Sequence, residues 1–410
     1  MDDASAALPE PLFQRAVGLL RELTAISSPS GDAEGLHRMA ERLAGELRER
    51  GLTTEIRDEP SAEAGRPLPV LQARGHPGTG PFRGPLLLVG HLDTVLAAAP
   101  PRLDGDRLVG TGALDMKGGL ATLVGALDLL RHRGQTPPAG LLLVTVPDEE
   151  VGGELSQAAV RRWGETARAL WVLEPGEPAD DAETIVAGRR GMFQWRLEIR
   201  GKAAHSGLHY WDGRSAIGAI ARWAVDAEGH SSDQGGPTVN IGRLVAGDAS
   251  FVDHLDTAHA LLGTERQLNV VPDRAVAEGE VRFLRPEDGA HALKYLRELA
   301  EDVGIFSSTA VTFTTGPEIP PVDPKGPHSA LCRRAVELAA DRGWRLEVET
   351  DRGGISFPNF LPDPNRLPIL DGLGPVGSGM HTREESVSLE SLRRRIVLLA
   401  DLLAEDGMRG

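Results

Sequence analysis

Short apolar runs alternate with amphipathic segments through the first half of the chain. Three of these runs contain no charged residue: 86–89, 141–146 and 169–173. Runs of this length are typical of strands that are buried on both faces of a parallel sheet. Residues 118–131 lie between the first two runs and have the apolar spacing of a helix, so the order is strand, helix, strand. With amphipathic helices expected at 12–23 and 33–50, the pattern predicts an α/β domain.

The pattern changes after about residue 189. Residues 193–199 alternate between apolar and polar side chains, as expected for a strand with one exposed face. A helix, two strands, a second helix and a strand are predicted next, at 215–227, 238–245, 275–283, 287–303 and 310–314. Two strand–helix–strand units of this kind predict a small α+β domain of ferredoxin-like type. The tail returns to helix at 328–342 and 389–404. We therefore expect one α/β domain, 1–189 and 317–410, interrupted by an inserted domain, 190–316.

Length and charge restrict the classes of function. The 410 residues are enough for two domains. The net charge of −16 argues against a nucleic-acid partner or an anionic membrane surface, because clustered Lys and Arg drive such binding. No apolar run reaches the roughly 18 residues of a membrane span, and no signal peptide is evident. A single cysteine, Cys332, excludes an intramolecular disulfide. We expect a cytoplasmic protein.

Candidate metal ligands follow the buried strands, at the edge where open α/β sheets build their sites. The first strand leads into His91 and Asp93, which lie on one side of an extended segment, so Asp93 can accept from the ring nitrogen that faces away from a metal. The second leads into Asp148-Glu149-Glu150. Adjacent residues on an extended loop point in opposite directions, so Glu150 suits a metal ligand and Glu149 a general base. The alternative is a solvated acidic turn.

Three further candidates lie elsewhere in the chain. Asp115 precedes a predicted helix, where it serves either as the helix N-cap or as a carboxylate that bridges two divalent ions. Glu174 follows the third buried strand, and His381 lies in a glycine-rich loop near the C-terminus. Each residue has an ordinary structural explanation by itself. Together with His91 and Glu150 they predict a metal centre.

These residues lie in five signatures that resemble the carboxypeptidase G, acetylornithine deacetylase, succinyl-diaminopimelate desuccinylase and aminoacylase family of dizinc hydrolases. The signatures are Gly-His-Leu-Asp-Thr-Val, Gly-Ala-Leu-Asp-Met-Lys-Gly-Gly, Pro-Asp-Glu-Glu-Val-Gly-Gly, Glu-Pro-Gly and Gly-Met-His-Thr. The resemblance implies two zinc ions per chain, with cobalt or manganese as alternatives, bridged by Asp115. It implies that His91 and Glu174 complete one metal site, and that Glu150 and His381 complete the other.

The resemblance also assigns roles around the metals. Glu149 would be the base, Asp93 the partner of His91, and Glu385 a supporting acid. The peptide bond between Asp115 and Met116 is often cis in the family.

The inserted domain resembles the family's lid and dimerisation domain, which implies a homodimer. His205, in Gly-Lys-Ala-Ala-His-Ser, matches a histidine that stabilises the oxyanion, usually in the partner's active site. Asn269 and Arg282 match contacts to a substrate carboxylate, for which the planar guanidinium of Arg is suited. Asn240 is a further candidate. The alternatives are an ordinary loop residue at His205 and a strand-face salt bridge at Arg282.

The chain departs from the family in its glycine loop. The family commonly has Gly-Gly-Thr-Ser-Asp-Ala-Asn, and this chain has Gly-Gly-Ile-Ser-Phe-Pro-Asn from Gly353 to Asn359. The backbone amides of Gly353 and Gly354 can still hold a carboxylate. Phe357 replaces the acid of the loop and predicts a more apolar pocket.

The combined expectation is a zinc-dependent hydrolase that cuts an amide or peptide bond in a small substrate with a free carboxylate, as a glutamate carboxypeptidase does. An N-acyl-amino-acid deacylase and a dipeptidase are alternatives within that class, and N-carbamoyl hydrolysis is a more distant one. An inactive family member that binds a ligand is the alternative outside enzymes. The presence of all five ligand positions and of Glu149 favours the enzyme.

Overall fold

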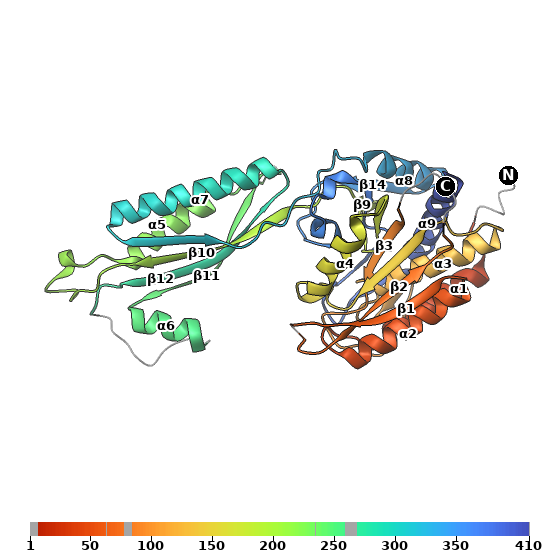
Figure 1. Ribbon diagram of the computed structural model, residues 1–410, viewed down its shortest axis with the longest axis horizontal. Coiled ribbons are helices and arrows are strands. Elements are labelled where there is room, and N and C mark those ends of the chain that lie inside the picture. The colour runs from red at the N-terminus through yellow and green to blue at the C-terminus, as the bar shows by residue number, and fades with distance from the viewer. Residues whose placement is uncertain (1–6, 63, 78–83, 234, 259–268, 410) are drawn as a thin grey trace. The chain divides into compact units, whose positions relative to one another are not determined.

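The chain folds into two compact units (Figure 1). The computed structural model describes residues 7–62, 64–77, 84–233, 235–258 and 269–409. The large unit comprises Met1–Gly188, Pro324–Arg352 and Ser356–Gly410, and the small unit comprises Arg189–Asp323 and Gly353–Ile355. The chain therefore leaves the large unit after Gly188 and returns to it at Pro324.

A six-stranded sheet forms the centre of the large unit. Its strands are β1 (Thr53–Glu59), β2 (Leu68–Arg74), β3 (Leu86–His91), β6 (Leu141–Val146), β7 (Ala169–Val172) and β15 (Ile369–Leu370). They are arranged in the order β1-β2-β6-β3-β7-β15. β3 pairs in parallel with β6 and β7, and β7 with β15, whereas β1 and β2 add antiparallel strands at one edge. β3 and β6 are buried along their whole length because the sheet is covered on both faces.

Helices of the large unit lie on both sides of this sheet, with α2 and α4 on opposite sides (Figure 1). The helices are α1 (Glu10–Ala25), α2 (Ala33–Glu49), α3 (Lys117–His132), α4 (Glu154–Gly164), α8 (Ser329–Asp341) and α9 (Leu389–Arg409). Every residue of α3 from Lys117 to Leu130 is buried. Its first turn reaches the end of β7 because Gly119 has no side chain: a Cβ there would lie 1.9 Å from the Leu173 carbonyl oxygen. This close approach brings the loop before α3 to the carboxyl end of the sheet.

Two small sheets complete the large unit. One contains β4 (Arg102–Asp104), β5 (Arg107–Val109), β16 (Gly377–Ser378) and β17 (Ser386–Ser388), and the other contains β8 (Pro178–Ala179), β9 (Ala182–Val186) and β14 (Arg345–Glu349). β17 pairs with β5, and the Gly110 amide donates to the Glu385 carbonyl at 2.8 Å. The loop between β16 and β17 is therefore fixed beside the segment that leads into α3.

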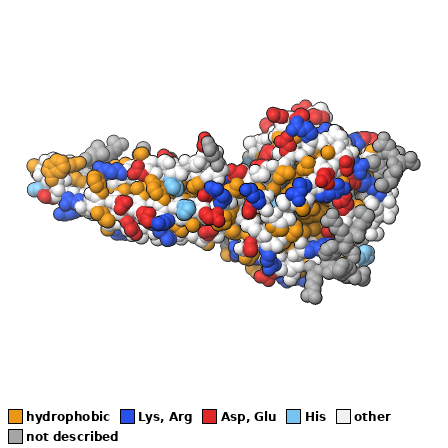
Figure 2. Space-filling model, turned by 90° about the horizontal axis from the view of Figure 1, so that it is seen from above, with side chains coloured by type: hydrophobic (Ala, Val, Ile, Leu, Met, Phe, Trp, Pro, Cys, Tyr) orange, Lys and Arg blue, Asp and Glu red, His pale blue; other side chains and the backbone are white. Residues whose placement is uncertain are grey.

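The small unit is an antiparallel four-stranded sheet with helices. Its elements are β10 (Gly191–Arg200), α5 (Ala216–Glu228), β11 (Thr238–Gly247), α6 (Ala249–Ala258), β12 (Arg274–Phe283), α7 (Pro286–Ser307) and β13 (Ala310–Thr315). The strand order is β11-β12-β10-β13. The core lies between the sheet and α5 and α7, where the rings of Trp195 and Trp223 meet edge-on at 4.9 Å. On the face shown in Figure 2, acidic and basic side chains are interspersed over both units.

The predicted elements are present, with ends that differ by a few residues. The hydrophobic pattern did not reveal β1, β2 and α4. Strand β1 is half exposed, so it lacks the continuous apolar run of a buried strand, and α4 is short and follows an acidic turn directly. Among the described residues, no helix is long and apolar enough to cross a bilayer.

A buried ion pair joins α9 to β9. Arg395 is fully buried, and its Nε donates to Glu183 Oε2 at 2.9 Å. Its Nη1 donates to the Gly372 carbonyl at 3.0 Å and its Nη2 to the Thr184 carbonyl at 2.8 Å. Both charges lie outside water, and removal of Arg395 would leave Glu183 only Ser391 and the more exposed Arg394, at 3.3 Å, as partners.

Replacing Arg395 with Ala should therefore lower the free energy of unfolding by about 3–5 kcal/mol. Urea unfolding followed by circular dichroism measures the change. The control is Arg38→Ala, which removes an exposed pair between Arg38 and Glu34 on α2. Exposed pairs of this kind contribute about 0.5 kcal/mol. Equal losses in the two variants would contradict the stabilising role of the buried pair.

Candidate metal centre

Five candidate ligands from distant parts of the chain meet at the carboxyl edge of the large sheet. His91 ends β3, Glu150 lies in a 3₁₀ turn just after β6, and Glu174 follows β7. Asp115 lies just before α3, and His381 is in the loop before β17. Parallel strands direct their carboxyl ends to one edge, so the strand-borne ligands converge there.

Asp115 lies between two histidines. Its Oδ1 is 3.0 Å from His91 Nε2, and its Oδ2 is 3.2 Å from His381 Nε2. Glu174 Oε1 lies 3.8 Å from the same nitrogen of His91, and Glu150 Oε2 lies 3.1 Å from that of His381. The five residues thus form two trios that share Asp115, one through each carboxylate oxygen.

The orientation of each histidine is restricted by a local feature of the chain. Nδ1 of His91 faces away from Asp115 and lies 3.0 Å from the Asp93 carbonyl oxygen and 3.3 Å from Asp93 Oδ1. His381 has a positive φ of 63°, a left-handed conformation that is uncommon outside glycine and is found at functional sites. Both side chains are thereby aimed at the same carboxylate.

Asp93 holds the acidic turn after β6. Its carboxylate accepts from the backbone amides of Glu149 at 3.3 Å and Glu150 at 3.2 Å, and from the hydroxyl of Ser30 at 2.7 Å. The side chain is fully buried. A residue on the β3 loop therefore fixes the backbone of the β6 loop.

Glu385 holds the segment before α3 in the same way. Its carboxylate accepts from the backbone amides of Gly112, Leu114 and Asp115, each at 2.9 Å. Burial raises the pKa of Glu385, and these three amides oppose that shift. The candidate bridging residue is thus held by an acid on the loop that carries His381.

Burial and mutual proximity shift the pKa values of four of these candidates, His91, Asp115, Glu150 and His381. Although burial opposes it, contact with Asp115 and Asp93 raises the pKa of His91 well above its ordinary value. The bond to Asp115 raises the pKa of His381 to about 9. Burial raises the pKa of Glu150 to about 8. The pKa of Asp115 lies below its usual range because the two imidazoles outweigh the effect of burial.

The donor set suits a metal. The ligand atoms of His91, Asp115 and Glu150 lie within 4.8 Å of one another, and so do those of His91, Glu149 and Glu174. Imidazole nitrogens and carboxylate oxygens are ligands for zinc, cobalt and manganese. The residues present therefore fit a pair of divalent cations.

The acidic turn itself differs from the sequence prediction. Residues Glu149–Val151 form a 3₁₀ helix, where an extended loop was expected. Gly152 and Gly153 follow with positive φ angles of 105° and 68°, which lets the chain turn directly into α4. Asp148 accepts from the amides of Leu155 at 2.6 Å and Ser156 at 3.0 Å at the start of that helix. Glu149 and Glu150 still face different neighbours, Glu150 facing His381.

His205 belongs to the small unit, in a tight turn. Its Nδ1 accepts from the backbone amides of Gly207 and Leu208, each at 3.2 Å. The ring is exposed. Because Nδ1 accepts, the proton of the neutral ring is on Nε2, which is then an outward donor. Asn269 is adjacent, since its carbonyl accepts from the Ser206 amide at 2.9 Å.

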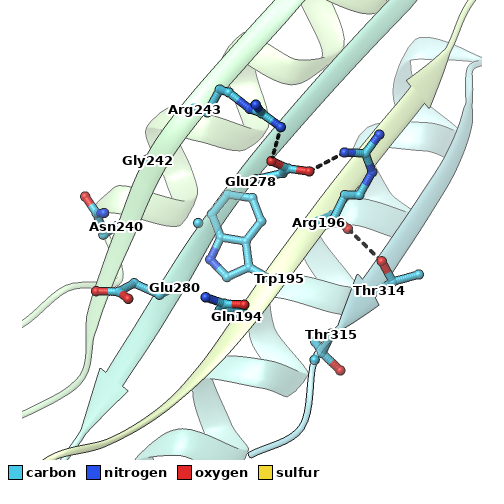
Figure 3. A pocket seen from close by; sticks show the side chains of 12 residues that line it. Gln194, Trp195, Arg196, Asn240, Gly242, Arg243, Glu278, Glu280, Thr314 and Thr315 are labelled. Atoms are coloured by element: carbon cyan, nitrogen blue, oxygen red, sulfur yellow. Dashed lines mark hydrogen bonds and ion pairs between the residues drawn. The ribbon is translucent and has the colours of Figure 1, made fainter. Parts of the chain in front are cut away.

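The remaining candidates lie around the open face of the small sheet. Arg282 donates from Nε to Glu280 Oε1 at 2.7 Å and from Nη1 to the Gly353 carbonyl at 2.6 Å. The Gly354 carbonyl accepts from Arg189 Nη1 at 3.1 Å. Asn240 borders a groove of about 570 Å³ on this face, close to Glu280 (Figure 3). Arg282 therefore forms the strand-face salt bridge that was the alternative to a role in substrate binding. The carbonyl groups of Gly353 and Gly354 both accept hydrogen bonds from arginines.

Comparison with known proteins identifies the family. Residues 87–405 match the model of Peptidase family M20/M25/M40. The chain belongs to this family. It is 27% identical over 409 residues to carboxypeptidase G2 from Pseudomonas sp. (strain RS-16), covering 97% of this chain and 92% of that protein.

Solved structures show the same fold. The aminopeptidase PepT from Bacillus cereus has a TM-score of 0.77 and 20% identity, over 97% of this chain and 99% of that one. A dinuclear metal binding peptidase of the M20 family from Bacillus subtilis has a TM-score of 0.66 and 17% identity, over 97% and 99%.

Membership confirms the family resemblance and the predicted class of enzyme, a hydrolase of peptide or amide bonds. The predicted fold class is confirmed as well. The Asp115–Met116 peptide bond is cis, as the resemblance implied.

Sequence reasoning missed three residues at the centre. Ser30 and Asp148 form the hydrogen bonds described above. Ser30 resembles an ordinary turn residue in the sequence, and Asp148 was noted only as part of the acidic cluster, with no role of its own. Lys117 is buried, donates from Nζ to the Ile26 carbonyl at 2.8 Å, and has its pKa lowered by burial to about 8. A lysine inside the apolar segment that opens α3 was the available signal.

Metal binding should release protons and strengthen with pH. His381 and Glu150, with pKa values raised to about 9 and about 8, hold protons at pH 7 that a divalent cation must displace. Zinc affinity should therefore rise from pH 6 to pH 8 by about tenfold per unit or more. Calorimetry in two buffers of different ionisation enthalpy counts the protons released. Binding without proton release would contradict these raised pKa values.

Proposed function

We propose that this family member is a dizinc metallopeptidase of the glutamate carboxypeptidase type, which cuts the amide bond of a small substrate with a free carboxylate. The arrangement at Asp115 carries the proposal. Its two oxygens face two imidazoles, and each imidazole has its own glutamate. A carboxylate placed in this way would be able to hold two divalent cations jointly.

In this proposal His91 and Glu174 hold one zinc ion with Asp115, and His381 and Glu150 hold the other. Cobalt and manganese are alternatives because they accept the same ligands. When bound, such a pair of cations acidifies water and polarises the scissile carbonyl. Asp93 fixes the orientation of His91 through Nδ1, which keeps Nε2 free to bind.

Glu149 acts as general base. Its backbone is fixed by Asp93, and its carboxylate lies within 4.8 Å of the ligand atoms of His91 and Glu174. It is only partly buried, so it can reach water beside the metal trios. It accepts a proton from the attacking water and returns that proton to the leaving nitrogen.

The small unit supplies the groups that bind the substrate. His205 offers the Nε2–H donor to the developing oxyanion. Arg282, with Asn240, Asn269 and the amides of Gly353 and Gly354, binds the free carboxylate. The three hydrogen bonds of Arg282 use three of its five N–H groups, so its guanidinium retains donors for a ligand.

The proposal includes the assembly and location. Residues 190–316 serve as lid and dimerisation domain of a cytoplasmic homodimer, and residues 1–189 and 317–410 form the catalytic domain. The long alignment with carboxypeptidase G2 and the ferredoxin-like order of the small sheet support this division.

Replacing Glu149 with Ala should keep two zinc ions per chain and lower kcat by about 10²–10⁴-fold, because the proton carrier is removed while the ligands stay. Metal analysis and amine release measure the two quantities. The control is Glu154→Ala, an exposed glutamate in the first turn of α4, which should retain full activity. Substantial activity in the Glu149 variant would exclude it as the base.

A substrate panel separates the proposed activity from its alternatives. We expect an N-acylated glutamate to be hydrolysed with higher kcat/KM than N-acetyl amino acids that lack a second carboxylate and than unblocked dipeptides. Release of free amine scores every member. Preference for N-acetyl substrates would favour the deacylase, preference for unblocked dipeptides the dipeptidase, and no hydrolysis with metal bound would favour a ligand-binding protein.

A further inference from the structure

The segment Ser356–Phe360 contacts both residues that complete one of the two trios. Phe357 is fully buried, and its ring centroid lies 6.5 Å from that of His91 at an interplanar angle of 33°. Ser356 is also buried, and its hydroxyl donates to Glu174 Oε1 at 3.5 Å. His91 and Glu174 lie on different strands of the sheet, so one short segment of chain touches the two ligands at once.

This segment is firmly held. Asn359 is buried, and its Oδ1 accepts from the Ser356 amide at 3.1 Å, which closes the turn. The Phe360 carbonyl accepts from Arg161 Nε at 3.3 Å on α4, and the rings of Phe357 and Phe360 meet edge-on at 6.4 Å. Leu361, which follows, fills the space that a Cβ at Gly164 would occupy. The turn that carries Ser356 and Phe357 is therefore anchored to α4 through Phe360 and Leu361.

The other trio is supported by Glu385 and Asp93, which also contact residues of the first trio. His381 lies in the loop that precedes Glu385, and Glu385 holds the segment of Asp115 through three backbone amides. Glu150 is held through its own amide by Asp93. Phe357 and Ser356 contact His91 and Glu174, the two residues that complete the first trio. Glu385 and Asp93, in contrast, form bonds to residues of both trios.

We propose that Phe357 and Ser356 are positioning residues for the metal ion held by His91 and Glu174, and that they set the affinity of this ion separately from that of the other. The inference rests on the proposed dinuclear centre. Phe357 fixes the plane of the His91 ring by packing against it, and Ser356 fixes one oxygen of Glu174. Groups that orient metal ligands in this way typically change metal affinity by 10–100-fold. The replacement of the loop acid by Phe357 then acts on the metal and does not line an apolar substrate pocket.

The test isolates each ion. Glu150→Gln weakens the site of His381, so the ion that remains is the one held by His91 and Glu174. Glu174→Gln does the reverse. Zinc affinity is measured in both backgrounds by competition with a chromophoric chelator, with and without Phe357→Ala. We expect Phe357→Ala to weaken zinc binding by about 10–100-fold in the Glu150→Gln background and by less than about threefold in the Glu174→Gln background.

Two controls make the result decisive. Phe13→Ala removes a buried ring from α1 that packs against Arg393, and it should leave the affinity of both ions unchanged. Ser356→Ala keeps Phe357 and should weaken the same ion as Phe357→Ala, and it carries the test if Phe357→Ala does not fold. Equal weakening in the two backgrounds, or none in either, overturns the proposal. An unmodified chain that binds fewer than two zinc ions contradicts the proposed function instead.

Discussion

The crowding of carboxylates at one edge of the large sheet is the constraint on which the candidate centre depends. Buried carboxylates are costly unless each has a partner. The protein meets this cost in two ways. Asp115, Glu150 and Glu174 face imidazoles, whereas Asp93 and Glu385 face backbone amides. The imidazoles that face Asp115, Glu150 and Glu174 hold protons that cations can displace. The backbone amides that face Asp93 and Glu385 remain their partners whether or not a cation is bound.

This division also explains why the loops are held firmly. Each acid that faces amides lies on one loop and binds the backbone of another: Asp93, after β3, holds the turn after β6, and Glu385, before β17, holds the segment before α3. A ligand cannot shift without breaking bonds to a neighbouring loop. These bonds tie together four of the five segments from which the centre is assembled and keep their ligands in one arrangement, as metal binding and catalysis both require.

The strand ends and the ligands that follow them were predictable because an uninterrupted apolar run followed by His, Asp or Glu is a strong local pattern. The rest depended on contacts that no local pattern encodes. The turn at Glu149 is helical because Asp93, 56 residues away in sequence, binds its amide. The sequence placed Phe357 in a substrate pocket, but the structure packs it against His91, since a side chain's neighbours are set by the whole fold. β1 was not predicted because it is half exposed. The role of Lys117 could not be assigned because its partner, the Ile26 carbonyl, is remote in the sequence.

Charge balance gives a physical reason for an aromatic ring beside His91. When deprotonated, Asp115, Glu149, Glu150 and Glu174 carry four negative charges toward the centre, which the two divalent cations of the proposed centre would neutralise. The amides around Asp93 and Glu385 and the ammonium group of Lys117 offset the two remaining acids. A further carboxylate against His91 would add an uncompensated charge and hold the proton of that imidazole more tightly, which a metal would have to displace. An apolar ring orients the imidazole at no electrostatic cost, so at this position packing can do what a hydrogen bond from the imidazole to a carboxylate would do elsewhere.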